Sequence, residues 1–455
     1  MAHHVVAAGY RRFVERLNKF PQGALPSELL YRIFALLLSE QDAALLAQLP
    51  LRPFTASAAA RAWKVSHGEA ERLLDGLADR ALLLDGEQDG KRMYVLPPPV
   101  IGFFEFSMMR VRSATDQRAL ADLFYQYLNV EDEFVAELFG TETQVGRALV
   151  HEPALPGRAG DGAGRLLRDR PHEEGDGAGP ADAGSLQVLD HELATEIVRQ
   201  AEHRAVGLCY CRHKMTHLGR ACEAPLEMCL SLDFAADSLA RHGHARRIDA
   251  AEAVAVIEQA WDLGLVQFAE NVRRHPKFIC NCCSCCCDAL IAARRFAILH
   301  PVTTSGFVPE VDAARCNGCG SCAAACPIEA ISVGSLDPSG DGRPPKPQVA
   351  CIDENVCFGC GLCVRACSTA ALRLRRSGER VVTPVSTAQR VVMQAIERGT
   401  LPYLVFDQQG LAAHRAAAAV LGVILRLPPL QRALASRQLK SRYLERIVDR
   451  DHWRY

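Results

Sequence analysis

Cys316-Asn-Gly-Cys-Gly-Ser-Cys-Ala-Ala-Ala-Cys-Pro327 is the stretch that decides most about this chain, because its cysteines follow the spacing C-x2-C-x2-C-x3-C. The same spacing recurs in Cys357-Phe-Gly-Cys-Gly-Leu-Cys-Val-Arg-Ala-Cys-Ser368. Closely spaced thiolates can hold three iron atoms of a cubane from one tight loop, and small residues such as Gly318 let backbone amides approach the sulfurs. Zinc sites typically use pairs of C-x2-C instead. The two runs therefore predict two iron–sulfur clusters.

These paired runs resemble the bacterial-type dicluster ferredoxin family, over a domain expected at residues 308–376. The resemblance implies two 4Fe-4S clusters and single-electron transfer, with the fourth cysteine of each run ligating the other cluster. The implied ligands are Cys316, Cys319, Cys322 and Cys367 for cluster one, and Cys357, Cys360, Cys363 and Cys326 for cluster two. The sequence departs from the family at Ser368, where proline usually follows, and in an insertion at residues 334–348. Cys351 lies outside both runs and is interpreted as a small buried residue.

A second concentration of cysteines precedes this domain. Residues 207–217 (GLCYCRHKMTH) contain two cysteines, and residues 280–287 (CNCCSCCC) contain six. Free thiols at this density would be prone to oxidation, so a soft metal or a third iron–sulfur cluster is the better explanation. The candidate ligands, of which a subset would be used, are Cys209, Cys211, Cys222, Cys229, Cys280, Cys282, Cys283, Cys285, Cys286 and Cys287. Their spacing matches no cubane run, so the type of centre stays open.

Basic residues follow the first of these cysteines. His213 and His217 are four residues apart, which suits either a metal-binding pair or a solvated helix face. Arg212, His213 and Lys214 would place positive charge beside thiolates, which favours a bound cluster or an anionic substrate.

Composition limits the other possibilities. All 19 cysteines lie between Cys209 and Cys367 in a chain of 455 residues, which in a reducing cytoplasm indicates metal rather than disulfides. The net charge of −1 predicts no general attraction to nucleic acid or to anionic membranes. The N-terminus lacks the pattern of a secretory signal, and the longest apolar run, residues 416–425, is too short to span a membrane. We therefore expect a cytoplasmic protein.

The expected fold is α+β and mostly helical. Residues 20–100 resemble a winged helix, with helices at 29–38, 56–63 and 68–80 and then two short strands around a turn at residues 85–90. The remaining expected parts are a helical connector (101–150), a flexible linker rich in Gly, Ala and Asp (151–184), a central cysteine-rich helical domain (185–301) and C-terminal helices (385–455). Within the central domain, Asp249 and Glu252 form a capping box that predicts a helix at residues 250–263.

The order of these parts carries a wider resemblance. The Cys-Tyr-Cys-Arg-His-Lys run, the six-cysteine run and the trailing dicluster ferredoxin together resemble a family of multidomain 4Fe-4S binding proteins of anaerobic bacteria and archaea. The resemblance spans about residues 185–440. It implies a redox role and does not indicate a substrate.

Three functions follow as hypotheses. The first is an electron-transfer protein that passes single electrons to or from a partner oxidoreductase, since no dinucleotide fingerprint or phosphate-binding loop is present. The second is a reductase with its own metal or iron–sulfur active site in the central domain. The third is a redox-responsive DNA-binding regulator. The expected recognition helix at residues 68–80 has four acidic residues against two arginines, which disfavours phosphate contacts. An electron-transfer component is favoured over a stand-alone oxidoreductase.

Overall fold

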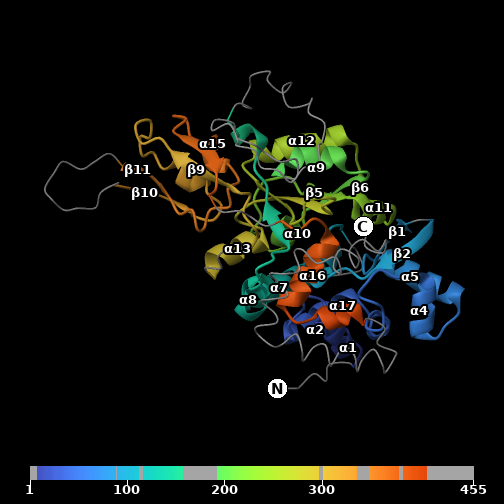
Figure 1. Cartoon of the computed structure of the whole chain (residues 1–455). Helices are drawn as coiled ribbons and strands as arrows, with labels where there is room; N and C mark the ends of the chain where they lie inside the picture. The colour runs from blue at the N-terminus through green and yellow to red at the C-terminus, as the bar shows by residue number, and fades with distance from the viewer. Residues whose placement is uncertain are drawn as a thin grey trace.

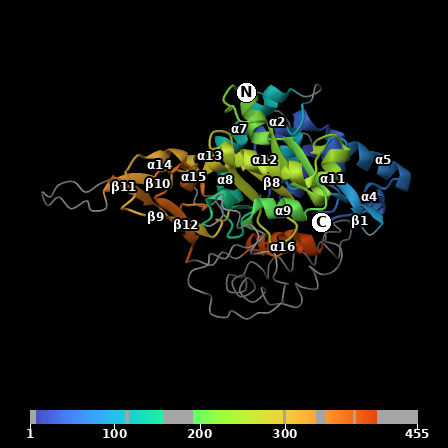
Figure 2. The same cartoon turned by 90° about the horizontal axis from the view of Figure 1, so that it is seen from above.

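The computed structural model describes residues 8–88, 90–111, 116–156, 192–296, 301–335, 348–378 and 383–406. They form a helical N-terminal unit, a six-stranded central sheet with its helices, and a small lobe at one side (Figure 1). Seen from above, the lobe projects away from the other two parts (Figure 2). The fold is therefore mixed α and β.

The N-terminal unit consists of five helices and one hairpin. The helices are α1 (Ala8–Leu17), α2 (Glu28–Leu37), α3 (Glu40–Leu46), α4 (Ala56–Trp63) and α5 (His67–Ala78), and the antiparallel strands are β1 (Leu84–Gln88) and β2 (Lys91–Val95). The hydroxyl oxygens of Ser27, Ser39 and Ser66 each accept a hydrogen bond from the backbone amide three residues on. These caps satisfy amides that have no partner within the first helical turn, and so they fix where α2, α3 and α5 begin.

The hairpin differs in detail from the sequence expectation. We expected a turn to begin at Asp85-Gly86, but both residues lie inside β1, where they pair with Tyr94 and Met93. The chain reverses later, next to Gly90, which has a φ of +70°. The prediction of an early turn was wrong, because Asp85 and Gly86 pack against Ser238 and Phe234 of a neighbouring helix, and these contacts favour the strand.

Three helices connect this unit to the sheet: α6 (Phe104–Ser107), α7 (Gln117–Asn129) and α8 (Asp132–Phe139). The apolar stretch that begins at residue 101 is packed into the N-terminal core, where Phe103, Phe104 and Met108 are buried. Phe103 contacts Phe13 and Phe34 ring to ring. The stretch is therefore a docked segment, as its composition indicated.

The central sheet has six antiparallel strands in the order β3-β7-β8-β5-β4-β6. Its strands are β3 (Gly146–Ala148), β4 (Arg204–Leu208), β5 (Glu227–Leu232), β6 (Arg246–Arg247), β7 (Val266–Glu270) and β8 (Phe278–Cys282). Its helices are α9 (Ala194–Gln200), α10 (Tyr210–His217), α11 (Asp233–Arg241), α12 (Ala250–Asp262) and α13 (Asp288–Arg295). The capping contact expected for α12 is present, since Asp249 Oδ1 accepts the amide hydrogen of Glu252.

The expectation of a helical central domain was wrong, because the domain is built on this sheet. Strands of five or six residues that are covered on both faces lack the alternation that identifies a strand. All five residues of β7 are buried, and β8 ends in the cysteines that sequence reasoning assigned to a metal motif. The edge strand β3 also comes from residues expected to form a helical connector.

The two faces of the sheet have different roles. Leu230 of β5 and Ile279 of β8 are opposite each other and belong to the apolar cluster that α9 and α12 cover. Because side chains alternate along a strand, Cys229, Cys280 and Cys282 project from the other face. The register that pairs Leu230 with Ile279 also places Cys229 opposite Cys280. The sheet therefore gathers cysteines from distant parts of the sequence on one face.

The projecting lobe has two similar halves. The first contains β9 (Phe307–Val311), α14 (Ser321–Ala325) and β10 (Ile331–Ser335), and the second contains β11 (Gln348–Ile352), α15 (Leu362–Ala366) and β12 (Leu372–Arg376). β9 pairs with β12, β10 pairs with β11, and α14 contacts α15. The two halves are therefore interleaved, and the cysteine runs at the starts of α14 and α15 lie close together.

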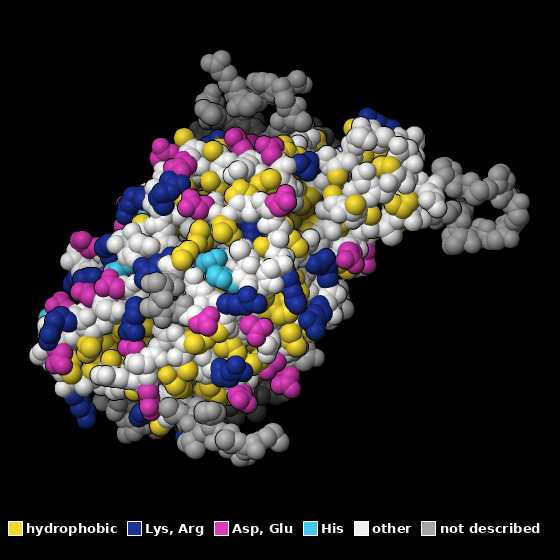
Figure 3. All heavy atoms as spheres, turned by 180° about the vertical axis from the view of Figure 1, so that it is seen from behind, with side chains coloured by type: hydrophobic (Ala, Val, Ile, Leu, Met, Phe, Trp, Pro, Cys, Tyr) yellow, Lys and Arg dark blue, Asp and Glu magenta, His cyan; other side chains and the backbone are white. Residues whose placement is uncertain are grey.

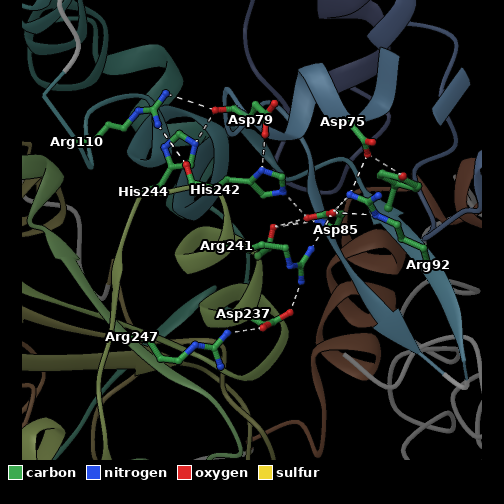
Figure 4. Close-up of polar contacts among 12 residues, drawn as sticks. Asp75, Asp79, Asp85, Arg92, Arg110, Asp237, Arg241, His242, His244 and Arg247 are labelled. Carbon is green, nitrogen blue, oxygen red and sulfur yellow. Dashed lines mark hydrogen bonds and ion pairs between the residues drawn. The ribbon is translucent and has the colours of Figure 1, made fainter. Parts of the chain in front are cut away.

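A buried carboxylate joins the hairpin of the N-terminal unit to α11 (Figure 4). Asp85 has no exposed side-chain surface, and its oxygens accept hydrogen bonds from Ser238, Arg241 and His242 of the sheet unit and from Arg92 of β2. A Cβ atom on Gly86 would come within 2.5 Å of the Phe234 ring, so the backbone approaches α11 closely. The hairpin is thus an internal contact surface.

Two further helices follow the lobe: α16 (Thr387–Glu397) and α17 (Leu401–Val405). α16 lies between the N-terminal unit and the sheet, since Ala395 packs with Leu51 and Arg390 pairs with Glu270. The C-terminal helices expected beyond residue 410, and most of the linker expected at 151–184, lie outside the described residues. Among the described helices, none is long and apolar enough to cross a membrane.

Candidate iron–sulfur centres and central thiol groups

Glycines shape the two cysteine loops of the lobe in the same way. Gly318 and Gly359 both have a φ of +68°, a backbone conformation that side chains disfavour. A Cβ atom on Gly318 would lie 2.6 Å from the carbonyl oxygen of Gln348, and one on Gly359 would lie 2.1 Å from that of Phe307. Each loop therefore packs tightly against a strand, and this contact fixes where its thiols point.

The cysteines of the lobe form two groups, and each group draws on both runs. A hollow of about 20 Å³ is lined by Cys357, Cys360 and Cys363 together with Cys326 of the first run. In the other group, Cys322 lies close enough to Cys316 and Cys367 for their thiols to influence its pKa, although burial is the main cause of the upward shift. Cys351 lies on β11, outside both groups, with its thiol near the carbonyl oxygen of Val349; it is partly exposed and not buried as expected.

Backbone amides point at the sulfurs of both runs. The amides of Ala330 and Ala371 each donate to the cysteine four residues before, Cys326 and Cys367, at 3.2 Å. The amide of Gly359 donates to Cys357 at 3.3 Å. Such hydrogen bonds stabilise thiolate sulfur and help to set the potential of a bound cluster.

The two groups differ in exposure. Cys319, in the first run, is exposed, whereas its counterpart Cys360, in the second, is buried; the next cysteines, Cys322 and Cys363, are both buried. Burial raises the pKa of Cys360 to about 12, so its thiolate forms only with a compensating cation such as iron. The group around Cys319 therefore faces the surface, and the group around Cys360 faces the interior.

The ten cysteines of the central domain also divide into two groups, which we name by position. The outer thiol group consists of Cys222, Cys283, Cys285 and Cys286, whose sulfurs all lie within 4.8 Å of one another. The sulfurs of Cys222 and Cys283 are 3.5 Å apart, and those of Cys285 and Cys286 are 3.6 Å apart. Cys285 is exposed. The outer thiol group thus has the arrangement of four ligands around one point.

The inner thiol group consists of the other six: Cys209, Cys211, Cys229, Cys280, Cys282 and Cys287. Hydrogen bonds connect five of them in a row, since Cys287 interacts with Cys211 and Cys282, and Cys280 interacts with Cys282 and Cys229. Contact with Cys229 and then with Cys282 lowers the pKa of Cys280 to about 5. The Cys211 and Cys282 thiols likewise lower the pKa of Cys287 well below its ordinary value. The same contacts raise the pKa of Cys211, Cys229 and Cys282, so the network favours thiolate, the form that binds metal, at Cys280 and Cys287.

Two buried cations lie beside these groups, as the sequence suggested. Arg212 is 1% exposed, and its Nη2 atom lies 3.5 Å from the sulfur of Cys283. Although burial acts against it, the neighbouring thiols of Cys209 and Cys283 raise the pKa of Arg212. Arg212 therefore joins the outer group to the inner group. Lys214 instead pairs with Asp288, whose other oxygen lies 3.7 Å from the sulfur of Cys211.

The histidines of α10 contact each other. His213 Nδ1 lies 2.8 Å from the carbonyl oxygen of Met108, and His213 Nε2 lies 3.2 Å from His217 Nε2. The 3.2 Å separation fits a hydrogen bond in which the Nε2 atom of one ring donates to the Nε2 atom of the other.

Sequence reasoning missed two carboxyl groups near the inner thiol group. The first is Asp288, which directly follows Cys287, the last cysteine of the six-cysteine run. Glu105 lies in the apolar segment before α7, where it accepts a hydrogen bond from the amide of Gly102. Burial raises the pKa of Glu105 to about 7, and its charge acts on Cys229. An acidic residue inside an otherwise apolar run was the signal available for it.

The inner thiol group is contiguous with the ferredoxin lobe. Cys282 and Cys287 belong to the same apolar cluster as Phe358 and Cys360. The ring of Phe358 meets Phe268 of β7 edge to face at 5.9 Å. The amide of His151 also donates to the carbonyl oxygen of Cys360, so the chain near the sheet edge is fastened to the second cysteine loop.

Comparison with known proteins agrees with the geometry of the lobe. Residues 315–371 match the family model of the 4Fe-4S dicluster domain. The ferredoxin-type protein NapF of Escherichia coli strains K12, CFT073 and O157:H7 is 33% identical to this chain over 75 residues, which is 16% of this chain. The match spans only 42% of the length of these relatives. No solved structure matches the chain.

The matched segment contains all eight cysteines of the two runs, and the loops around them are shaped alike. The lobe is therefore a 4Fe-4S dicluster ferredoxin domain, and this chain carries two 4Fe-4S clusters.

Proposed function

We propose that this protein is an electron-transfer component that passes single electrons between a partner oxidoreductase and a third metal centre in its own central domain. The observation that carries the proposal is the shared apolar cluster of Cys282, Cys287, Phe358 and Cys360. Electron transfer between centres needs close, packed contact and no conformational change. A ferredoxin domain fastened to a cysteine-rich sheet satisfies this requirement.

The cluster ligands follow from the two groups of thiols in the lobe. Cluster one uses Cys316, Cys319, Cys322 and Cys367, and cluster two uses Cys357, Cys360, Cys363 and Cys326. The hollow lined by Cys326 and the three cysteines of the second run supports this exchange of the fourth ligand. Ser368, in the place of the usual proline, removes no thiol from either set.

The central thiols form two further centres in this proposal. The inner thiol group holds a third iron–sulfur cluster, since its six thiols, five of them connected by hydrogen bonds, exceed the four ligands that a cubane needs. The outer thiol group holds a single soft ion such as zinc. A zinc–sulfur distance of ~2.3 Å in a tetrahedron implies sulfurs ~3.8 Å apart, close to the separations of 3.5 and 3.6 Å.

The exposure of the thiols gives the order of the centres along the path. Cys319 of cluster one is exposed, Cys360 of cluster two is buried, and Cys282 of the inner thiol group is buried. A redox partner protein therefore docks at cluster one, and electrons pass to or from it at that end of the path. Asp312 and Arg315, just before the first cysteine run, are both exposed, so charged side chains of both signs border this docking site.

A DNA-binding role for the winged-helix-like unit is disfavoured. Its hairpin contacts α11 through Asp85, and Asp79 at the end of α5 pairs with His242 (Figure 4). Positive and negative side chains are interspersed on the face in Figure 3, without a broad basic patch. The unit serves as an internal support in this proposal.

A reductase activity at the inner thiol group remains the second candidate, since six thiols leave two beyond a cubane.

Stopped-flow reduction of the anaerobic, full-length protein by a reduced flavodoxin tests the electron path. The variant Cys319→Ala removes the exposed ligand of cluster one, and Cys351→Ala changes a cysteine outside every group. We expect Cys319→Ala to slow reduction of the remaining centres at least tenfold, while Cys351→Ala reduces at the wild-type rate. Iron analysis of both variants checks that cluster two is retained. Equal rates in Cys319→Ala and wild type would reject entry through cluster one.

A further inference from the structure

An apolar cavity of about 200 Å³ lies where the N-terminal unit, the sheet and α16 meet. Its walls are mostly aliphatic and aromatic side chains from all three parts, including Leu51, Leu96, Phe234 and Val391. An apolar cavity of ~150 Å³ in another protein holds a benzene molecule, so this one has room for a slightly larger ligand. Cavities that combine such walls with a few polar groups are the usual sites for small molecules.

The charged groups of the cavity wall lie together at one end, because Glu270 contacts both Arg390 and Lys277. Both oxygens of Glu270 are engaged, one by Arg390 Nη2 at 3.0 Å and the other by the backbone amide of Lys277 at 2.9 Å. Arg390 Nη1 donates to Gln394. The Lys277 amine, in contrast, is buried and has no hydrogen-bond partner among the described residues, and the same holds for Arg390 Nε.

The charges at this end do not balance. Two cationic side chains face one carboxylate, so with Lys277 protonated the site has one positive charge in excess, and burial lowers the pKa of Lys277. Asp233 also attracts Lys277, but its carboxylate lies against His275 and the amide of Glu202 and lines a separate hollow. An unpaired buried amine costs folding free energy, and a bound anion would offset that cost. The donors left without a partner are Lys277 Nζ and Arg390 Nε, and a carboxylate accepts hydrogen bonds from cationic groups of this kind.

We propose that the cavity binds a monocarboxylic acid of about eight to ten heavy atoms in all, its carboxylate beside Lys277 Nζ and its apolar body against the apolar walls. A neutral molecule would leave the amine unpaired, and an apolar amine would add like charge. A dianion would bring one negative charge more than the site can balance. The site therefore selects for a single negative charge joined to an apolar chain or ring.

The cavity is next to the inner thiol group. Phe278 and Ser231 line it, and Cys280 and Cys229 lie two residues away on the same strands and therefore on the same face of the sheet. Cys229 also packs against the apolar cluster that includes Leu84, Phe106 and Phe234 of the cavity wall. The bound acid would therefore lie beside the central thiols. This inference goes beyond the electron path and does not depend on it.

Isothermal titration of the anaerobic, full-length holoprotein with octanoate tests the proposal, with octanol and octylamine as neutral and cationic probes of equal length. We expect saturable binding of one octanoate per chain, and binding of both other probes at least about tenfold weaker. Lys277→Met keeps the apolar stem and removes the charge, so it should weaken octanoate binding at least about tenfold. Val391→Trp should fill the cavity and abolish binding while Lys277 is kept.

Lys91→Met is the matched control, because Lys91 is an exposed lysine of β2 away from the cavity wall. It should leave octanoate binding within twofold of wild type. Three results would overturn the proposal: octanol bound as tightly as octanoate, unchanged binding in Lys277→Met, or no saturable binding of octanoate or phenylpropionate at millimolar concentration. Loss of the electron path in the Cys319→Ala variant would leave this result unaffected, so failure of one idea is distinguishable from failure of the other.

Discussion

Replacing Asp85 by asparagine should loosen the contact between the hairpin and α11. One oxygen of Asp85 accepts from Ser238 Oγ at 3.1 Å and faces His242 Nε2 at 2.8 Å, and the other accepts from Arg92 at 2.7 Å and from Arg241 at 2.9 Å. Asparagine fits the same space, but it has no charge, and its amide group would face donors.

The size of the effect follows from burial. Removing one partner of a buried ion pair costs ~3–5 kcal/mol, because the other charges lose their compensation. The side chains of Arg92 and Arg241 are 46% and 39% exposed, so water recovers part of that cost. We therefore expect a loss of about 2–3 kcal/mol, which corresponds to roughly 30- to 150-fold more frequent opening of the contact.

The pH dependence of this contact has a definite sign. Burial opposes ionisation of Asp85, yet Arg92, His242 and Arg241 hold its pKa below the ordinary value. A carboxylate with a lowered pKa contributes stability that is complete above the unfolded value of ~3.9 and is lost as the pH falls through the lower folded value. Asp85→Asn should abolish this part of the acid sensitivity.

Hydrogen exchange followed by mass spectrometry on the anaerobic holoprotein measures the opening, at residues 84–88 and 235–242. The control is Asp237→Asn, which also removes a partner of Arg241 but at a more exposed position. That control should change exchange less than about fivefold, as for a surface ion pair. Exchange in Asp85→Asn within threefold of wild type would refute the view that this carboxylate holds the hairpin in place.

Three further predictions concern other contacts. Burial lowers the pKa of His151 to about 4, so the contribution of the neutral ring to stability is complete above pH ~6.5. About 3 kcal/mol of stability is lost as the pH falls from there to ~4. Hydrogen exchange at residues 148–155, corrected for its intrinsic pH dependence, should show this loss in wild type but not in His151→Gln. Although burial acts against it, pairing with Arg80 and Ser39 lowers the pKa of Asp42 to about 2. Asp42→Asn should therefore lower the urea midpoint at pH 7 by an amount equal to about 1–2 kcal/mol after allowance for solvent screening, and the difference from wild type should vanish as the pH falls from ~3.8 to ~2. Equal urea midpoints at pH 7 would count against this pair. Gly359→Ala should reduce bound iron by about four atoms per chain, because its Cβ would lie 2.1 Å from the Phe307 carbonyl oxygen, whereas Gly378→Ala, which meets nothing within 4 Å, should keep wild-type iron content.

The sequence was most informative where one local pattern determined the structure. Eight cysteines at fixed spacing identified both cluster loops, because cluster ligands must come from one short segment and its repeat. The cap at Asp249 gave the start of α12 for the same reason, since a helix cap depends on residues within one turn. No distant part of the chain was needed for either result.

The central sheet could not be read in this way. Cys229 and Cys280 meet because β5 and β8 are neighbours, although about fifty residues separate them. Strand pairing of this kind depends on contacts that no local pattern encodes. The division of ten cysteines into an outer and an inner thiol group therefore appeared only with the fold. The same is true of the cavity at Lys277, whose walls come from three separate parts of the chain.

Iron and acid-labile sulfide analysis of the anaerobically purified protein tests the central claim most directly. The comparison includes wild type, the triple variant with Cys280, Cys282 and Cys287 changed to Ser, and Cys351→Ser, each with EPR spectra after reduction. The triple variant leaves three thiols in the inner group, one fewer than a cubane needs, so we predict about twelve iron atoms per chain in wild type and in Cys351→Ser, and about eight in the triple variant, with one set of EPR signals missing. About eight iron atoms in all three proteins would contradict a third iron–sulfur cluster at the inner thiol group.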